Sequence, residues 1–164
     1  MWAGRRLLVF GGLGLAAGLG GLVAGLYGWR TLNARDTIHG AAEAGCDLQR
    51  GSCRAHFPDG GEMILSITPR PIPLLKPIEI NIELRNLPAG NVAVDVRSPD
   101  MNMGYNRREL ATHDGQRYRG HTVLPVCILK RMRWELRAIA HQGNTRHEAV
   151  FGFVTETRRQ GEPG

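Results

Sequence analysis

Apolar and polar residues alternate along most of the chain from about residue 46 onwards. In the clearest segments every second residue is apolar, and most of the residues between them are charged or polar. Successive side chains of a β-strand point to opposite faces of a sheet, so this period of two predicts strands with one face on a core. The segments are 63–68, 78–84, 92–96, 117–124, 132–140 and 147–154, with weaker candidates at 53–57 and 105–111.

Turn-forming residues separate the predicted strands. Their sequences are PDGG at 58–61, PRPIPLLKP at 69–77, NLPAGN at 86–91 and HDGQ at 113–116. Glycine, asparagine and aspartate favour turns, and a proline cannot donate the backbone hydrogen bond of a central strand. Short strands joined by turns predict an all-β fold, an antiparallel immunoglobulin-like β-sandwich of about seven strands. Trp134 lies among its inward-facing apolar positions and is expected to anchor the core.

Residues 7–29 form a run of 23 residues without a charge, and a membrane-spanning helix needs about 20. Arg5 and Arg6 precede the run, so the positive-inside rule places residues 1–6 in the cytoplasm. The sequence therefore predicts a single-pass membrane protein with its C-terminal domain outside the cytoplasm. The remaining parts are a linker at 30–45, the β-sandwich at 46–156 and a disordered tail at 157–164.

A cleaved signal peptide is the competing interpretation of the apolar run, because it also begins with basic residues. Its apolar core is shorter, about 7–15 residues, and ends in a small-x-small sequence. The clearest such sequence here, Ala42-Glu43-Ala44, lies far downstream. The uncleaved anchor is the interpretation that the length of the run favours.

Six glycines in the apolar run recur every three or four residues, which places them on one face of a helix. Small residues at this spacing let two membrane helices approach closely. The pattern predicts a packing face for a membrane-protein partner or for a second copy of the chain. The alternative is the composition of a GC-rich genome, which the 19 arginines against 2 lysines also suggest. The glycines are Gly11, Gly14, Gly18, Gly21, Gly25 and Gly28.

The net charge of +6 does not indicate a nucleic-acid-binding protein. The arginines are scattered along the chain rather than gathered in one patch, and an exported domain meets no genome. The expected partner is the inner membrane, and a positive chain is also attracted to anionic lipid headgroups.

The order of the predicted strands also places the sulfur-containing side chains. Consecutive antiparallel strands run in opposite directions, so their connections fall at alternate ends of the domain. The loops 69–77, 98–104 and 125–130 are then expected at one end. This end would gather Cys46, Cys53, Met101, Met103 and Cys127, and the opposite end would gather His56, His113, His141 and His147.

The three cysteines are expected to form one disulfide and one free thiol, because cysteines of exported proteins tend to be oxidised. Cys46 and Cys53 are separated by six residues. A disulfide between them would pin the start of the sandwich. Cys127 is then the odd thiol, which is either buried and inert or functional.

Met101 and Met103 lie in the loop sequence SPDMNMGYN, where methionine is unusual. Side chains two residues apart on an extended segment point the same way, so both thioethers could reach one ion. Thioethers and thiolates select Cu(I), which makes Cys127 the candidate third ligand, with Cys46 and Cys53 as alternatives if they are reduced. The competing interpretation is that both methionines are core side chains that close the end of the sandwich.

Several short sequences resemble the FixH-like and YtkA-like families, small β-sandwich domains outside a bacterial membrane that often follow one N-terminal span. These are DMNMG, DGQRYRG, LPVC and RMRWELRAIA, within about residues 62–155. The families pair a methionine-bearing loop with a Gly-x-Tyr-x-Gly-type strand and a tryptophan-bearing strand. The positions that match are Met101, Met103, Tyr118, Gly120 and Trp134. The resemblance to FixH-like proteins implies a role in assembling copper-containing respiratory oxidases. The whole chain also resembles single-span proteobacterial membrane proteins that share CDL…C, PRPIP and MNMG.

An enzyme is not expected, because the sequence has no Gly-x-Ser-x-Gly, no phosphate-binding loop and no evident carboxylate pair. Two functions fit the sequence. The first is a membrane-anchored periplasmic domain that binds or delivers copper, as a metallochaperone does, or that assists assembly of a copper-containing respiratory enzyme. The second is a metal-free scaffold that holds a partner through the glycine face and through an exposed sheet edge or loop.

Overall fold

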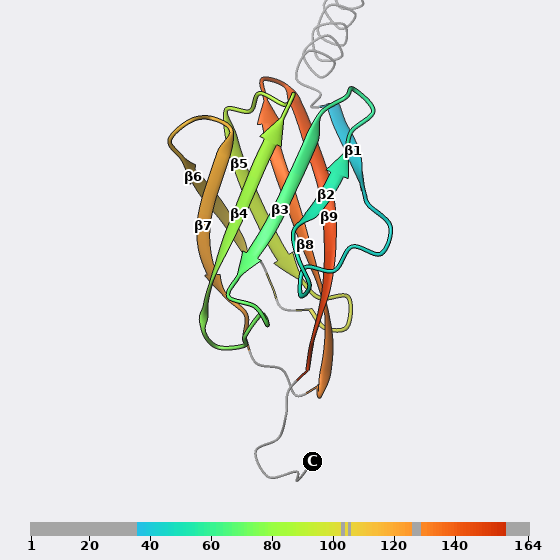
Figure 1. Ribbon diagram of the computed structural model, residues 1–164, viewed down its shortest axis with the longest axis vertical. Helices are drawn as coiled ribbons and strands as arrows, with labels where there is room; N and C mark the ends of the chain where they lie inside the picture. Colours follow the sequence, from blue (N-terminus) through green and yellow to red (C-terminus); the bar gives the residue numbers. More distant parts are fainter. Residues whose placement is uncertain (1–35, 103, 105, 126–128, 157–164) are drawn as a thin grey trace, which may run out of the picture. The chain divides into compact units, whose positions relative to one another are not determined.

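In the computed structural model, the described part of the chain is residues 36–156 without 103, 105 and 126–128. This part consists of nine β-strands joined by turns and loops (Figure 1). The strands are β1 (Asp36–Ala42), β2 (Cys53–His56), β3 (Glu62–Thr68), β4 (Pro77–Arg85), β5 (Asn91–Arg97), β6 (Arg107–Thr112), β7 (Arg117–Val123), β8 (Arg131–Gln142) and β9 (Thr145–Glu156).

The strands form a closed barrel rather than the predicted sandwich. Their order around the ring is β1, β2, β3, β4, β7, β6, β5, β8 and β9, and β9 pairs again with β1. The β1–β9 pair is parallel, whereas the other neighbours are antiparallel. The all-β content is as predicted. The prediction of an immunoglobulin-like sandwich is wrong, because every described strand has a hydrogen-bonded neighbour on both sides.

Two strands close the ring because each changes its partner along its length. Residues 36–40 of β1 pair with β9, whereas Ala41 and Ala42 pair with β2. Residues 107–110 of β6 pair with β5, whereas 111 and 112 pair with β7. A period of two looks the same in a strand that stays in one sheet and in one that crosses to another. The sequence pattern therefore did not distinguish the two folds.

A glycine makes room for a packed side chain at each of the two places where a strand changes its partner, which we call the crossings. A Cβ atom on Gly40 would lie 2.7 Å from the ring of Phe57, and one on Gly120 would overlap the side chain of Leu110. Leu110 is the buried residue of β6, so it is the side chain through which this strand joins the core. Both crossings therefore depend on a backbone position without a β-carbon.

The alternating pattern decides which face of each strand forms the core. In β4 every second residue is buried, and β3 follows the same rule. Trp134 of β8 is 2% exposed, and its indole Nε1 donates a hydrogen bond to Thr155 Oγ1 at 2.8 Å. Its ring stacks on Phe153 with a centroid distance of 6.1 Å. Trp134 is therefore the core anchor that the sequence predicts.

β1 lies inside the segment 30–45 that the sequence assigns to a linker. Its residues are exposed or half-buried throughout, so the strand carries no alternation of buried apolar side chains. It is held in the ring by backbone pairing with β9 and β2, and its partly buried Ile38 and Ala42 pack against the core. The pattern of apolar and polar residues in the sequence therefore does not identify β1 as a strand.

The predicted membrane-spanning helix over 7–29, with its glycine face, lies outside the described residues, as does the tail 157–164. Residues 36–156, apart from the gaps given above, contain no helix and so none long and apolar enough to cross a membrane. The predictions of a sandwich behind an anchor helix and of a single-pass, inner-membrane location with a periplasmic domain are corrected on this finding.

Antiparallel pairing sends successive connections to alternate ends of the barrel. The connections 43–52, 69–76, 98–106 and 124–130 leave the strands at one end, which we call the methionine end because Met101 lies there. The connections 57–61, 86–90, 113–116 and 143–144 leave at the other end, the turn end. Figure 1 shows the turn end at the top and the methionine end at the bottom. The predicted alternation of loops thus holds in the barrel.

Candidate functional site

The sequence predicts a sulfur site at the methionine end, and the structure describes three of its five residues. Cys46 and Cys53 form a disulfide with their Cα atoms 5.6 Å apart, so the predicted disulfide is present. Bridged sulfurs are not thiolates, which removes both cysteines as the alternative copper ligands. Met103 and Cys127 lie outside the described residues.

Met101 is half-buried and packs against the hydrophobic core. This position corresponds to the second interpretation of the methionines, in which they close the end of the core. Within the described residues no three His, Cys, Asp or Glu side chains lie close enough together to hold a metal ion. The prediction of a copper-binding group is corrected for this part of the chain. The set Met101, Met103 and Cys127 stays a prediction that the described residues do not test.

The disulfide and the methionine loop, residues 98–102, lie close to each other at this end. Cys46, Pro99 and Trp134 line one shallow hollow on the surface. Gln49 spans the same region, because its Nε2 donates to the Val154 carbonyl at 2.8 Å and its Oε1 accepts from the Ile72 N–H at 2.8 Å. The loops at the methionine end are therefore fastened to one another and to β9.

An ion pair fixes the methionine loop to the start of β8. The Arg133 side chain donates to Asp100 Oδ1 from Nε at 2.9 Å and from Nη2 at 2.5 Å. The Arg133 backbone N–H donates to Asp100 Oδ2 at 2.8 Å. The side-chain bonds, followed by the backbone bond, hold the pKa of Asp100 below its ordinary value. The same side-chain pairing raises the pKa of Arg133.

The methionine loop curls around an open hollow of about 630 Å³. Two local bonds shape the loop: the Asp100 N–H donates to Ser98 Oγ at 3.1 Å, and the Gly104 N–H donates to Asn102 Oδ1 at 3.0 Å. Arg97 and Asp95 form an ion pair at the wall of the hollow, with Nη2 and Oδ2 2.6 Å apart. The hollow is therefore polar, with Met101 as its apolar lining residue beside Pro99.

Two apolar side chains at the methionine end face solvent, and we call Leu75 and Val123 the apolar shelf. Leu75 is 63% exposed and Val123 is 45% exposed. They lie on adjoining backbone segments, because Pro77 pairs with Val123 and the Leu75 N–H donates to the Leu124 carbonyl at 2.9 Å. Leu75 has a φ of 58°, in a left-handed region that costs a leucine about 1–2 kcal/mol. The fold thus keeps the Leu75 side chain exposed to solvent although its backbone conformation is unfavourable.

Both lysines of the chain lie beside exposed leucines at the methionine end. Lys76 follows Leu75, and Lys130 follows Leu129, which is 37% exposed. Both lysines are exposed, and neither forms a salt bridge with a carboxylate of the described residues. This combination is not predicted from the sequence, because neither a leucine in a proline-rich loop nor a single lysine is a motif. The composition, with two lysines in all, was the available signal.

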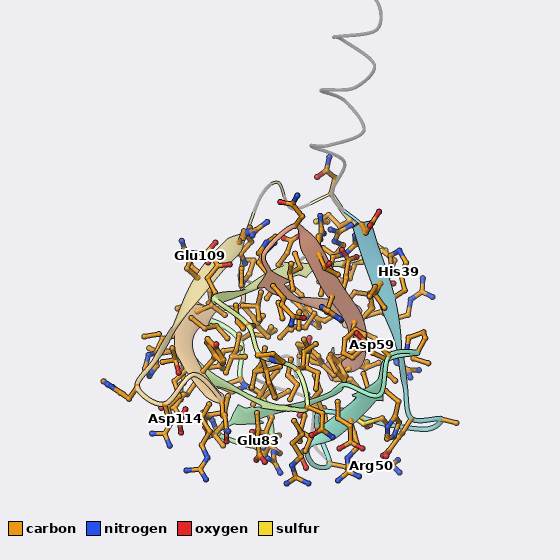
Figure 2. All side chains as sticks on the ribbon, turned by 90° about the horizontal axis from the view of Figure 1, so that it is seen from above. His39, Arg50, Asp59, Glu83, Glu109 and Asp114 are labelled. Carbon is orange, nitrogen blue, oxygen red and sulfur yellow. A yellow bond between two sulfur atoms is a disulfide. The ribbon has the colours of Figure 1, made fainter. Side chains whose placement is uncertain are left out.

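A buried histidine lies at the turn end, outside the sulfur site. His147 is 1% exposed and its Nε2 lies 2.6 Å from Asp59 Oδ2, while Nδ1 has no hydrogen-bond partner among the described residues. The edge of the Phe57 ring packs against the imidazole at a centroid distance of 5.2 Å. The bond to His147 is the main cause that lowers the pKa of Asp59. Figure 2, which looks onto the turn end, shows Asp59 on the side of β1 and Asp114 across the barrel.

No family model matches the chain, and neither a curated protein nor a solved structure matches it. The resemblance to FixH-like and YtkA-like domains therefore stays a prediction.

Proposed function

We propose that the chain is a non-catalytic binding domain that holds a partner protein at its methionine end. The observation that carries the proposal is the apolar shelf, in particular Leu75. A single exposed leucine needs no explanation in a soluble domain. A leucine that is exposed and also held in a strained backbone conformation needs an explanation. Such strain persists where the surrounding structure enforces it, and it is concentrated at functional sites.

The loop that carries Leu75 is anchored on both sides. Ile72 is buried and its N–H bonds to Gln49, and Leu74 packs against the core. On the other side, the Leu75 N–H bonds to the Leu124 carbonyl. A partner would therefore meet an ordered surface and would not have to order the loop at its own entropic cost.

The closed ring favours binding of a partner through the loops over binding through a sheet edge. The scaffold hypothesis from the sequence used an exposed sheet edge, but each described strand already has two neighbours. Addition of a partner strand needs a free edge, so contact through the loops is the part of that hypothesis that the barrel supports. Copper delivery gains no such support, because Met101 packs against the core and Cys46 and Cys53 are bridged.

Site-specific photo-crosslinking in the organism's own cells tests the proposal. A photoreactive residue is placed in the full chain at position 75 or 123, with position 150 as the control. Val150 is a matched control because it is 40% exposed but lies on β9, outside the shelf. We expect the same protein adduct from positions 75 and 123 and none from 150. No adduct from 75 and 123, or equal labelling from 150, would contradict the proposal.

A further inference from the structure

Carboxylates at the methionine end of the barrel are already engaged by other side chains. Asp100 is held by Arg133, and Glu156 lies 3.9 Å from Arg131. Glu79, two residues after Pro77, accepts from Asn81 at 2.7 Å and lies 3.5 Å from His121. None of these carboxylates pairs with a lysine of this end.

Three cations at the methionine end have no carboxylate partner among the described residues, and two of them, Lys76 and Arg70, lie on the loop that carries Leu75. Lys76 and Lys130 each follow an exposed leucine, as described above. Arg70, on the same loop as Leu75, uses its Nε to donate to the Ile67 carbonyl at 3.0 Å. The shelf thus combines aliphatic side chains with uncompensated positive charge, and the complementary surface is aliphatic and negative.

A second copy of the chain does not fit this surface well. The chain carries a net charge of +6, so two copies repel each other before any contact forms. A symmetric dimer would also bring the shelf lysines of both copies to one interface, and like charges that meet across an interface are unfavourable.

A lipid surface fits less well than a protein segment. Membrane binding scales with the apolar area inserted, and a single acyl chain alone binds a membrane only marginally. Leu75 and Val123 together offer less apolar area than such a chain. A peptide can add contacts to the polar hollow beside Met101, which a flat bilayer cannot enter.

We infer that the partner presents an acidic, leucine-rich segment, whose aliphatic side chains lie on the apolar shelf while its carboxylates meet Lys76 and Lys130. This inference rests on the proposed function and adds the chemistry of the partner. The contact is apolar in its centre and ionic at its rim, which is the usual arrangement of protein interfaces. Its affinity falls as salt is raised, because the rim charges are exposed.

Fluorescence anisotropy with the full chain tests the inference. The probe is a labelled synthetic peptide that alternates leucine with glutamate, and its matched control has glutamine in place of glutamate. We expect the glutamate peptide to bind about tenfold more tightly than the glutamine peptide at low salt. The double variant Lys76→Gln/Lys130→Gln removes this difference, whereas Arg117→Gln at the turn end preserves it.

The shelf itself is tested with Leu75→Ser/Val123→Ser, with Val150→Ser as the matched control. We expect the double variant to lose at least about tenfold in affinity for the glutamate peptide, and the control to bind as the unchanged chain does. Unchanged circular dichroism and thermal unfolding show that the variants are folded, as expected for exposed positions.

Three results would overturn the inference. Equal affinity for the glutamate and glutamine peptides, or no binding of either, would exclude an acidic partner, while the crosslinks from positions 75 and 123 would still support a binding domain. Unchanged affinity of the shelf double variant would exclude the shelf as the contact. Binding to phosphatidylserine vesicles that is lost in Lys76→Gln/Lys130→Gln would assign the surface to lipid instead.

Discussion

Asp100 and Arg133 form three hydrogen bonds with each other although they are 33 positions apart in the chain. The contact uses both carboxylate oxygens of Asp100 and joins the backbone as well as the side chain of Arg133. It fastens the methionine loop to the first residues of β8, so the loop position depends on a strand that the sequence does not place beside it.

Replacing Asp100 by asparagine should loosen the methionine loop while the barrel stays folded. Asparagine keeps the size of aspartate but loses the charge-assisted bonds to the guanidinium. We expect faster amide hydrogen exchange in residues 98–102 and no change in β4, measured by mass spectrometry. Ser98→Ala, which removes one local bond of the loop, is the milder comparison. Equal protection in Asp100→Asn and the unchanged chain would show that the ion pair does not hold the loop.

Adding a methyl group at either strand crossing should destabilise the barrel. Gly40→Ala would drive a Cβ atom into the ring of Phe57, and Gly120→Ala would drive one into Leu110. Overpacking of this kind costs about 1–3 kcal/mol. Gly51→Ala is the control, because a Cβ atom there meets nothing within 4 Å. The measurement is urea unfolding, and a Gly40→Ala variant as stable as Gly51→Ala would refute the packing argument, because the ring of Phe57 can move aside less easily than the terminal methyl group of Leu110.

Removal of the disulfide should lower the free energy of unfolding without abolishing the fold. The bridge closes a short loop, with a sequence separation of 7, so the loop-entropy account gives about 2–3 kcal/mol. Cys46→Ser/Cys53→Ser in urea unfolding measures this difference. A thiol count on denatured, unreduced protein should find one free thiol among the three cysteines of the chain. A count of three would contradict the bridge.

Met101→Leu distinguishes a core methionine from a metal ligand. Leucine has a similar volume, so a side chain that only packs should lose less than about 1.5 kcal/mol of stability. Met101→Ser should cost more, because it removes the apolar contact with the core. Affinity for Cu(I), measured in competition with a chromophoric chelator, should be the same for the unchanged chain and for Met101→Leu. A large loss of affinity in Met101→Leu would instead support the copper hypothesis.

Asp59 should make the stability of the barrel depend on acid pH. Its pKa in the folded chain lies below the ordinary value of 3.8, mainly because of the bond to His147. The folded state therefore gains stability above the unfolded pKa and loses it as the pH falls through the lower folded pKa. Relative to Asp59→Asn, the unchanged chain should lose stability below about pH 4, as measured by urea unfolding across the acid range. A constant difference at all pH values would contradict this assignment.

Asp59→Ala adds a second effect that does not depend on the carboxylate charge. It leaves the Nε2 atom of the buried His147 without an acceptor, which costs about 1–3 kcal/mol. Asparagine at position 59 keeps an acceptor oxygen, so Asp59→Asn should lose less stability than Asp59→Ala at neutral pH.

Most of the strands could be predicted from the sequence because their burial alternates. Six of the nine strands fall on the segments with a clear period of two, β2 and β6 fall on the two weaker candidates, and the loop ends follow from the antiparallel order. β1 could not be found in this way, because its position depends on backbone pairing with β9, which side-chain hydrophobicity does not encode. Closure of the ring pairs Asp36 with Thr145, which lie far apart in the sequence.

The candidate site was predicted only in part. Strand order placed Met101 and the disulfide at one end, but the solvent-facing position of Leu75 depends on a left-handed backbone conformation. That conformation is enforced by the buried Ile72 on one side and the bond to Leu124 on the other. Neither constraint appears in a one-dimensional pattern of apolar and polar residues.

Closure of the barrel also bears on how the chain avoids aggregation. A free strand edge pairs with other chains through its backbone, whatever their sequence, and grows into aggregated sheets. In the described part every strand has a neighbouring strand on both sides, although β6 pairs with β7, and β1 with β2, over only two residues of each strand. The exposed leucines at the methionine end therefore attract other molecules mainly through side chains. Contact through side chains depends on the sequence of the other molecule, so the exposed leucines can bind a partner selectively. A free strand edge beside them would also pair with other chains whatever their sequence.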